Sequence, residues 1–61
     1  MKIYEITHPE FQAVTGSLKD VIHAIRSESW DRYGINLDTA IFEEFEGVLR
    51  CGYEEFARVE E

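Results

Sequence analysis

Apolar side chains between residues 17 and 34 recur at spacings of three and four, the period of a helix with one buried face. The positions on this face are Leu18, Val21, Ile22, Ile25 and Ser29. Ser17 can cap the first turn, and Asp20 is placed to complete a capping box with it. Gly34 can adopt the left-handed conformation that closes many helices. The pattern therefore predicts a helix from 18 to about 33.

A second apolar stretch has the same period and predicts another helix near 39–51. Its stripe is made of Ile41, Phe42, Phe45, Val48 and Leu49. Asp38 is a suitable cap, and Leu37 can pack on Phe42 as a hydrophobic staple. Glu46 and Arg50 then form a favourable ion pair one turn apart, and Gly52 ends the helix. Phe45 is expected at the centre of the core.

The two ends of the chain are rich in β-forming residues. Residues 2–7 predict a strand, which the His8-Pro9 pair terminates because proline lacks an amide proton and restricts the residue before it. Residues 11–14 are a candidate for a second short extended segment. Residues 53–59 are interpreted as a last strand, although their alternation is imperfect and a helix there is the alternative.

These elements predict an α+β fold of the order strand, helix, helix, strand, in one acidic domain that spans residues 1–61. Both helices would pack on one face of a small sheet. Ile3 and Phe56 would then lie on the uncovered face. Such an apolar pair is normal on a surface, but it also fits self-association, and the open edges of a small sheet favour strand pairing.

The chain has a net charge of -7, and this charge is uneven. Residues 1–35 hold five acids and four bases, whereas residues 36–61 hold eight acids and two bases, so the second part alone carries -6. This charge argues against direct contact with nucleic acid or with an anionic membrane surface. It provides solubility in one interpretation and a surface for a basic partner in the other.

The search for chemistry finds no catalytic, cofactor or metal motif. His8, His23 and Cys51 are far apart in the sequence and form no metal-binding spacing. Cys51 would lie at the negative end of the second helix, which disfavours its thiolate, so we expect no functional role for it. The glycines are isolated and build no phosphate loop. A chain of 61 residues also has little volume for a substrate pocket, and we expect no enzyme, no cofactor and no metal.

Trp30 does not follow the pattern of the first helix. At about 100° per residue it falls roughly 130° from the centre of the apolar stripe. One interpretation is an exposed interface anchor, because Trp is enriched among the residues that dominate binding energy. The alternative is that the ring folds back over the core.

In size and charge the chain resembles the small acidic accessory proteins of phages and other mobile elements, many of which inhibit host proteins that handle nucleic acid. The resemblance involves no motif. The first hypothesis is a protein-binding inhibitor or regulator whose carboxylates occupy a basic, nucleic-acid-binding surface of its partner. The residues expected to bind are Trp30, Glu43, Glu44, Glu46, Glu54 and Glu55. The alternative is a homo-oligomeric subunit, such as a homodimer, with no nucleic-acid-related partner.

The compartment is predicted from the cysteine content and the N-terminus. A secreted domain of this size normally needs disulfides, and a single cysteine cannot form one within the chain. Residues 1–8 lack the long apolar core of a signal peptide. We therefore expect a cytoplasmic protein.

Overall fold

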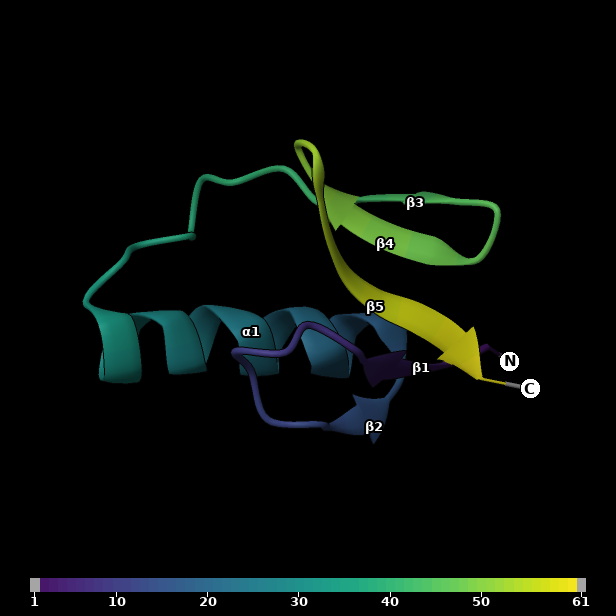
Figure 1. The fold of residues 1–61 in the computed structure, drawn as a ribbon, viewed down its shortest axis with the longest axis horizontal. Coiled ribbons are helices and arrows are strands. Elements are labelled where there is room, and N and C mark those ends of the chain that lie inside the picture. The colour runs from purple at the N-terminus through teal and green to yellow at the C-terminus, as the bar shows by residue number, and fades with distance from the viewer. Residues whose placement is uncertain (1, 61) are drawn as a thin grey trace.

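The computed structural model describes residues 2–60 as one five-stranded antiparallel sheet with one helix (Figure 1). The strands are β1 (Ile3–Ile6), β2 (Thr15–Gly16), β3 (Glu43–Phe45), β4 (Val48–Cys51) and β5 (Glu54–Glu60), and helix α1 spans Leu18–Tyr33. The sheet order is β2-β1-β5-β4-β3, so β5 joins the N-terminal hairpin to the C-terminal strands. The expected α+β arrangement of two helices on a sheet is therefore wrong.

Helix α1 agrees with its sequence prediction in both limits and caps. The Ser17 side chain accepts a hydrogen bond from the Asp20 amide, and the Asp20 carboxylate accepts one from the Ser17 amide. Gly34 closes the helix with φ of 66°. The helix packs on β1 and β2 and buries Val21, Ile25 and Ser29, which belong to the predicted stripe.

The predicted second helix near 39–51 is instead the connection 34–42 followed by the β3–β4 hairpin. Glu46 and Gly47 have φ of 53° and 79°, and together they form a two-residue turn between the paired ends Phe45 and Val48. Positive φ at both central positions is the type I′ geometry, which matches the twist of the flanking strands. Asp38 consequently caps no helix, and Glu46 and Arg50 do not form the expected helical ion pair.

Phe56 lies in the core and not on the uncovered face, which corrects a second prediction. The partner of Leu49 is Ala57 and that of Arg50 is Glu55, so Phe56 is an extra residue, a β-bulge. A bulge places two consecutive side chains on the same side of a sheet. Phe56 and Ala57 are accordingly both buried. The last strand itself is confirmed at Glu54–Glu60, and Tyr53, which was expected within it, lies fully exposed in the preceding turn.

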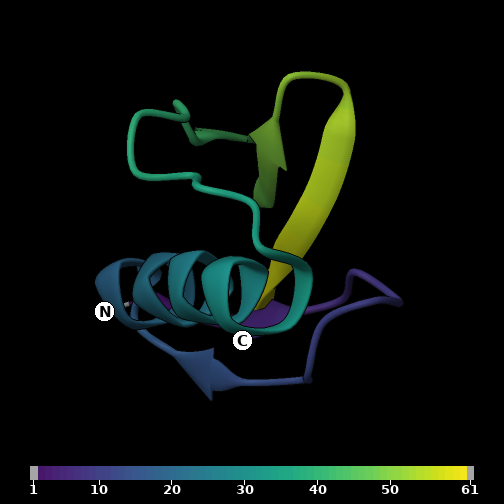
Figure 2. The same cartoon turned by 90° about the vertical axis from the view of Figure 1, so that its left-hand side faces the viewer.

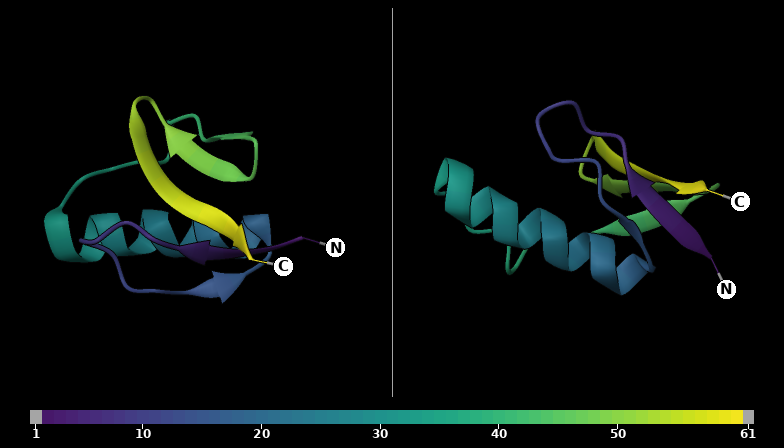
Figure 3. Two further views of the ribbon diagram at one scale, coloured as in Figure 1. Left: turned by 45° about the vertical axis from the view of Figure 1, so that its right-hand side comes forward. Right: turned by 90° about the horizontal axis from the view of Figure 1, so that it is seen from below.

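The sheet is strongly curled. In sheet order β1 and β3 are separated by two other strands, which would place them about 14 Å apart in a flat sheet. The Tyr4 hydroxyl nevertheless donates to Glu44 Oε1 at 2.9 Å. Figure 2 and Figure 3 show the β3–β4 hairpin and the connection 34–42 on the side of the sheet that α1 covers. We call this concave side the inner face and the opposite side the outer face.

The core occupies the inner face between α1, β1 and β5. Its buried side chains are Tyr4, Ile6, Val21, Ile25, Leu49, Phe56 and Ala57. Phe45, which was expected at its centre, is 68% exposed. The register places Phe45 opposite Val48, and Val48 opposite Arg58, on the outer face. Ile3 lies on this face as expected, half-buried.

Candidate functional site

The β3–β4 hairpin forms one edge of the sheet, and every residue of β3 is exposed. Neighbouring residues of a strand point to opposite faces. Glu43 and Phe45 therefore lie on the outer face, Glu44 lies on the inner face, and Glu46 lies in the turn. The acids expected on one side of a helix are thus divided between two faces of a sheet.

Glu44 links β3 to β1 across the inner face of the curled sheet. Its carboxylate accepts hydrogen bonds from the Tyr4 hydroxyl and from the Gly47 amide at 3.3 Å, and Lys2 Nζ lies 3.5 Å away. The hydrogen bond from Tyr4, followed by that from Gly47, lowers the pKa of Glu44 below its usual 4.5. Burial, together with the hydrogen bond to Glu44, raises the pKa of Tyr4. Glu44 therefore has a structural role, and its oxygens are already engaged.

Glu54 and Glu55 also have partners within the chain. Glu54 Oε2 lies 2.7 Å from His8 Nε2, and Glu55 Oε2 lies 2.7 Å from Arg58 Nε. The hydrogen bond from Arg58 lowers the pKa of Glu55. Glu55 and Glu43 flank Arg50 in register on the outer face, whereas Glu54 points to the inner side. Because Glu54 and Glu55 are engaged within the chain, they contribute less free charge to a docking surface than the sequence predicts.

Glu43 and Glu46 differ from the other acids. Within residues 2–60 no hydrogen bond or ion pair engages either carboxylate. The side chain of Phe45 lies between them in the sequence and is largely exposed. Together these three residues, Glu43, Phe45 and Glu46, form what we call the hairpin surface. It combines two free carboxylates with an aromatic ring on a short, projecting element.

Trp30 lies away from the hairpin surface, on the side of α1 that faces the connection 34–42. Its side chain is 62% exposed, as expected for an anchor and not for a ring folded over the core. It lines an open hollow of ≈ 630 Å³ between α1 and the connection, together with His23, Arg26 and Leu37. The structure therefore does not bring Trp30 together with the predicted acids.

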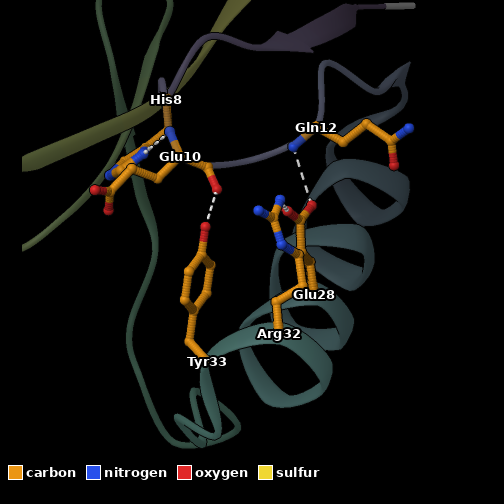
Figure 4. Close-up of polar contacts among 6 residues, drawn as sticks. All are labelled: His8, Glu10, Gln12, Glu28, Arg32 and Tyr33. Carbon is orange, nitrogen blue, oxygen red and sulfur yellow. Dashed lines mark hydrogen bonds and ion pairs between the residues drawn. The ribbon is translucent and has the colours of Figure 1, made fainter.

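The loop between β1 and β2 is held against α1 by several polar contacts (Figure 4). The Gln12 amide donates to Glu28 Oε1 at 3.0 Å, and Arg32 pairs with Glu28 Oε2 at 2.8 Å. These bonds, led by the one from Gln12, lower the pKa of Glu28. The Tyr33 hydroxyl donates to the Glu10 carbonyl. The contacts fasten the loop to α1.

His8 is the one buried histidine of the described residues, and both of its ring nitrogens are occupied. Nδ1 accepts from the Glu10 amide at 3.2 Å, which leaves Nε2 to donate to Glu54. Its ring packs against those of Phe11 and Phe56, with centroids 5.1 and 4.8 Å away.

Cys51 lies at the end of β4, half-buried, and packs on the core. The helix-dipole argument for its inertness is therefore wrong, because no helix ends there, and its lack of a role stays a prediction. In the part of the chain described, no three His, Cys, Asp or Glu side chains converge to hold a metal ion. Over the same residues, no helix has the length and apolar character needed to cross a membrane.

Sequence reasoning missed the exposed apolar residues of the C-terminal part. Phe45, Ile41 and Tyr53 are 68%, 75% and 103% exposed. The sequence feature that indicates the hairpin is the Glu46-Gly47 pair. A glycine at the second position of a two-residue loop between β-forming residues is typical of a hairpin. No protein-family model, curated protein or solved structure matches this chain.

Proposed function

We propose that this chain is a protein-binding inhibitor or regulator that docks its hairpin surface on a basic patch of a larger partner. The observation that carries the proposal is the largely exposed Phe45, with Glu43 on the same face of β3 and Glu46 in the adjoining turn, both of whose carboxylates lack a partner within residues 2–60. Binding energy in protein interfaces concentrates in a few aromatic anchors, and charged residues around them provide selectivity and steering. The hairpin surface has both components.

The partner's chemistry follows from charge. The chain carries -7, and residues 36–61, which contain the hairpin, carry most of it. Long-range attraction therefore favours a partner with exposed Lys and Arg. Proteins that handle nucleic acid present such surfaces as grooves for phosphates. Docking there would compete with DNA or RNA, in the manner of a nucleic acid mimic.

The acids are divided between two faces of the sheet, which reduces the number of carboxylates that one docking surface can present. A broad acidic face made of Glu43, Glu44, Glu46, Glu54 and Glu55 is not formed. A standard interface of about 800 Å² per partner would take about a fifth of the 4427 Å² surface of the chain. The hairpin surface is the centre of such an interface, with the outer-face residues Val48 and Arg50 next to it.

Binding without catalysis is part of the proposal. The buried histidine has no free nitrogen, and the most strongly engaged acids serve the fold. The proposal includes no cofactor, no direct nucleic-acid binding and no membrane surface. We place this function in the cytoplasm, because a domain this small with one cysteine lacks the disulfides of secreted domains.

Capture from a cell lysate tests the proposal. The immobilised full chain is incubated with lysate at 0.1 M salt, and retained proteins are identified before and after a wash at 1 M. Because the Debye length falls from about 10 to about 3 Å, we expect release of a basic protein at high salt. Added DNA or RNA should also displace it. A retained protein that resists both salt and nucleic acid would contradict the proposal.

Self-association is the second candidate, and one observation favours it. The outer face carries Ile3, Val48 and Phe45, and no other element of the described chain covers it. Pairing between the β3 edges of two copies is disfavoured, because Glu43, Glu44 and Glu46 of one copy would face the same acids of the other. Charged residues commonly protect sheet edges in this way. Sedimentation equilibrium separates the two: a dimer that resists salt and is lost in Phe45→Ala would support this candidate.

A further inference from the structure

Strand β2 forms the edge of the sheet opposite to β3, and one side of its backbone is unpaired. The Ile6 amide donates to the Val14 carbonyl at 3.0 Å, so these two residues form a hydrogen-bonded pair. Such pairs alternate along an antiparallel ladder, and the amide and carbonyl of Thr15 therefore point away from β1. Ala13 has the same phase, and no backbone hydrogen bond engages it within residues 2–60. We call the open backbone groups of Ala13 and Thr15, which are both exposed, the β2 edge.

The two edges of the sheet differ in their protection against strand pairing. Glu43, Glu44 and Glu46 place charges along the β3 edge. Residues 11–17, which run along the β2 edge, contain no charged residue and no proline, and both of these features commonly block an edge. Only the short length of β2 limits pairing, because few residues form few hydrogen bonds. A strand added here therefore needs further contacts from its side chains.

Such contacts are available in an open hollow of ≈ 670 Å³ between α1 and the segment 9–14, which face each other in Figure 4. Its apolar and small side chains are Phe11 and Val14 on one side and Ala24 and Ser27 on the other. Val14 packs on the core, so its side chain points to the inner face. A strand added to β2 would lie about 4.8 Å from it, and alternate side chains would point to the inner face beside Val14. An extended segment can therefore pair with the β2 edge and fill the hollow together.

The charged lining of the hollow is not balanced. It consists of Glu10, Glu28, Asp31 and Arg32. Arg32 and Glu28 pair with each other at 2.8 Å, and within residues 2–60 no hydrogen bond or ion pair engages the carboxylate of Glu10 or Asp31. The remaining charge of the lining is negative and favours a Lys or Arg side chain. Both free carboxylates are exposed, so they contribute selectivity more than affinity.

We propose that the β2 edge binds an extended segment of a partner protein as an additional strand, with a Lys or Arg side chain in the hollow beside Glu10 and Asp31. Main-chain hydrogen bonds supply the affinity in this mode of recognition, and pockets for alternate side chains supply the specificity. A second copy of the chain fits less well, because its own residues 11–17 contain no basic side chain for the hollow. This site goes beyond the proposed function, because it uses the edge of the sheet opposite to the hairpin surface.

The test begins with random peptides of about ten residues, long enough to extend past β2 and the hollow, displayed on phage and selected against the immobilised full chain. The enriched peptides are then synthesised. We expect them to carry a Lys or Arg at one fixed position among β-forming residues. Amide hydrogen exchange locates the bound peptide: the amides of Ala13 and Thr15 should exchange more slowly in the complex, whereas the exchange of the Glu44 amide at the other edge should not change.

Two substitutions of Thr15 test the backbone contact, with affinity measured by the fluorescence anisotropy of a labelled selected peptide. Thr15→Pro removes the outward amide and should weaken binding at least about tenfold, because a peptide carbonyl is left without its partner. Proline is tolerated at a sheet edge where the amide faces solvent, so the unfolding midpoint should stay close to that of the parent. Thr15→Ala keeps the amide and should bind within about threefold of the parent.

Two charge reversals test the hollow. Glu10→Lys with Asp31→Lys should weaken the same peptide at least about tenfold, because like charges would then meet in the hollow. Glu43→Lys with Glu46→Lys makes the same change in net charge at the hairpin surface and should leave peptide binding within about threefold. A partner held by the hairpin surface should show the opposite order, so this proposal and the proposed function can fail separately.

The proposal would be overturned by enrichment of acidic peptides or of no peptide, by unchanged exchange of the Ala13 and Thr15 amides, or by equal affinities of Thr15→Pro and Thr15→Ala. Protection of Thr15 that grows with chain concentration in the absence of peptide would also overturn it, because a second copy would then occupy the β2 edge. If Thr15→Pro does not fold, hydrogen exchange in the parent decides alone.

Discussion

Phe45 and Phe56 have the same side chain in opposite surroundings. Phe56 is 5% exposed, and its ring contacts those of His8, Phe11 and Phe42. Phe45 is 68% exposed. Phe56→Ala should cost about 3–5 kcal/mol, most of the stability of a domain this small, and Phe45→Ala about 0.5 kcal/mol. Urea unfolding of the two variants measures both losses of stability. Equal losses would show that Phe56 has been wrongly assigned to the core.

The Tyr4–Glu44 hydrogen bond gives a prediction for pH. The pKa of Glu44 is lower in the folded state than its ordinary 4.5. Its contribution to stability is therefore complete above about pH 4.5 and is lost as the pH falls through the folded pKa. Glu28 and Glu55 act in the same direction.

Tyr4→Phe isolates this contribution, because it keeps the buried ring and removes the hydroxyl that donates to Glu44. We expect the Glu44 pKa to rise towards 4.5, as measured by a carboxyl NMR titration. The loss of stability between pH 5 and pH 3 should become smaller in this variant, whereas the titrations of Glu28 and Glu55 should not move. An unchanged Glu44 titration would show that the sheet does not close across its inner face.

At the scale of elements, α1 could be predicted and the hairpin could not. The helix has an apolar stripe, a capping box and a terminal glycine that all agree. In the hairpin, Phe45 and Val48 face outward and Leu49 faces inward. An uncovered face normally carries polar residues, but here it carries the apolar Phe45 and Val48, so the alternation of a half-buried strand is lost. The remaining apolar residues recur at spacings of three and four, as they would in a helix. The bulge at Phe56 likewise breaks the alternation of apolar and polar residues in β5.

The candidate site was predicted in part. Trp30 is exposed, as one of its two interpretations required, and Glu43 and Glu46 are free on the hairpin. The roles of Glu44, Glu54 and Glu55 could not be predicted, because their partners Tyr4, His8 and Arg58 depend on strand register and sheet curl. The register of a hairpin is set by its turn, and the turn at Glu46-Gly47 was interpreted as part of a helix.

Glu46→Asn tests the turn directly. Asn is favoured before Gly in a type I′ turn, since it tolerates the positive φ that Glu46 adopts at 53°. We expect a gain of a few tenths to about 1 kcal/mol in the free energy of unfolding. In a helix the same change would be destabilising, because Asn is a weaker helix former than Glu. Lower stability on urea denaturation would therefore argue for the two-helix arrangement.

At the scale of the whole molecule, the proposed function rests on charge and shape. The acidic C-terminal part projects as a hairpin, and the basic residues of α1 lie on another side. In the proposed function, the hairpin surface would steer the chain towards a basic partner, and Phe45 would be the anchor.

The most direct test of the central claim is the affinity of a captured, purified partner for matched charge-reversal variants. Glu43→Lys with Glu46→Lys reverses the hairpin surface; Glu10→Lys with Asp31→Lys makes the same change in net charge away from it. At 0.1 M salt we expect the first variant to bind roughly 100-fold more weakly and the control within about threefold, because like charges would face each other only at the hairpin. At 1 M salt the difference should shrink. Equal affinities for the two variants at both salt concentrations would contradict docking through the hairpin surface.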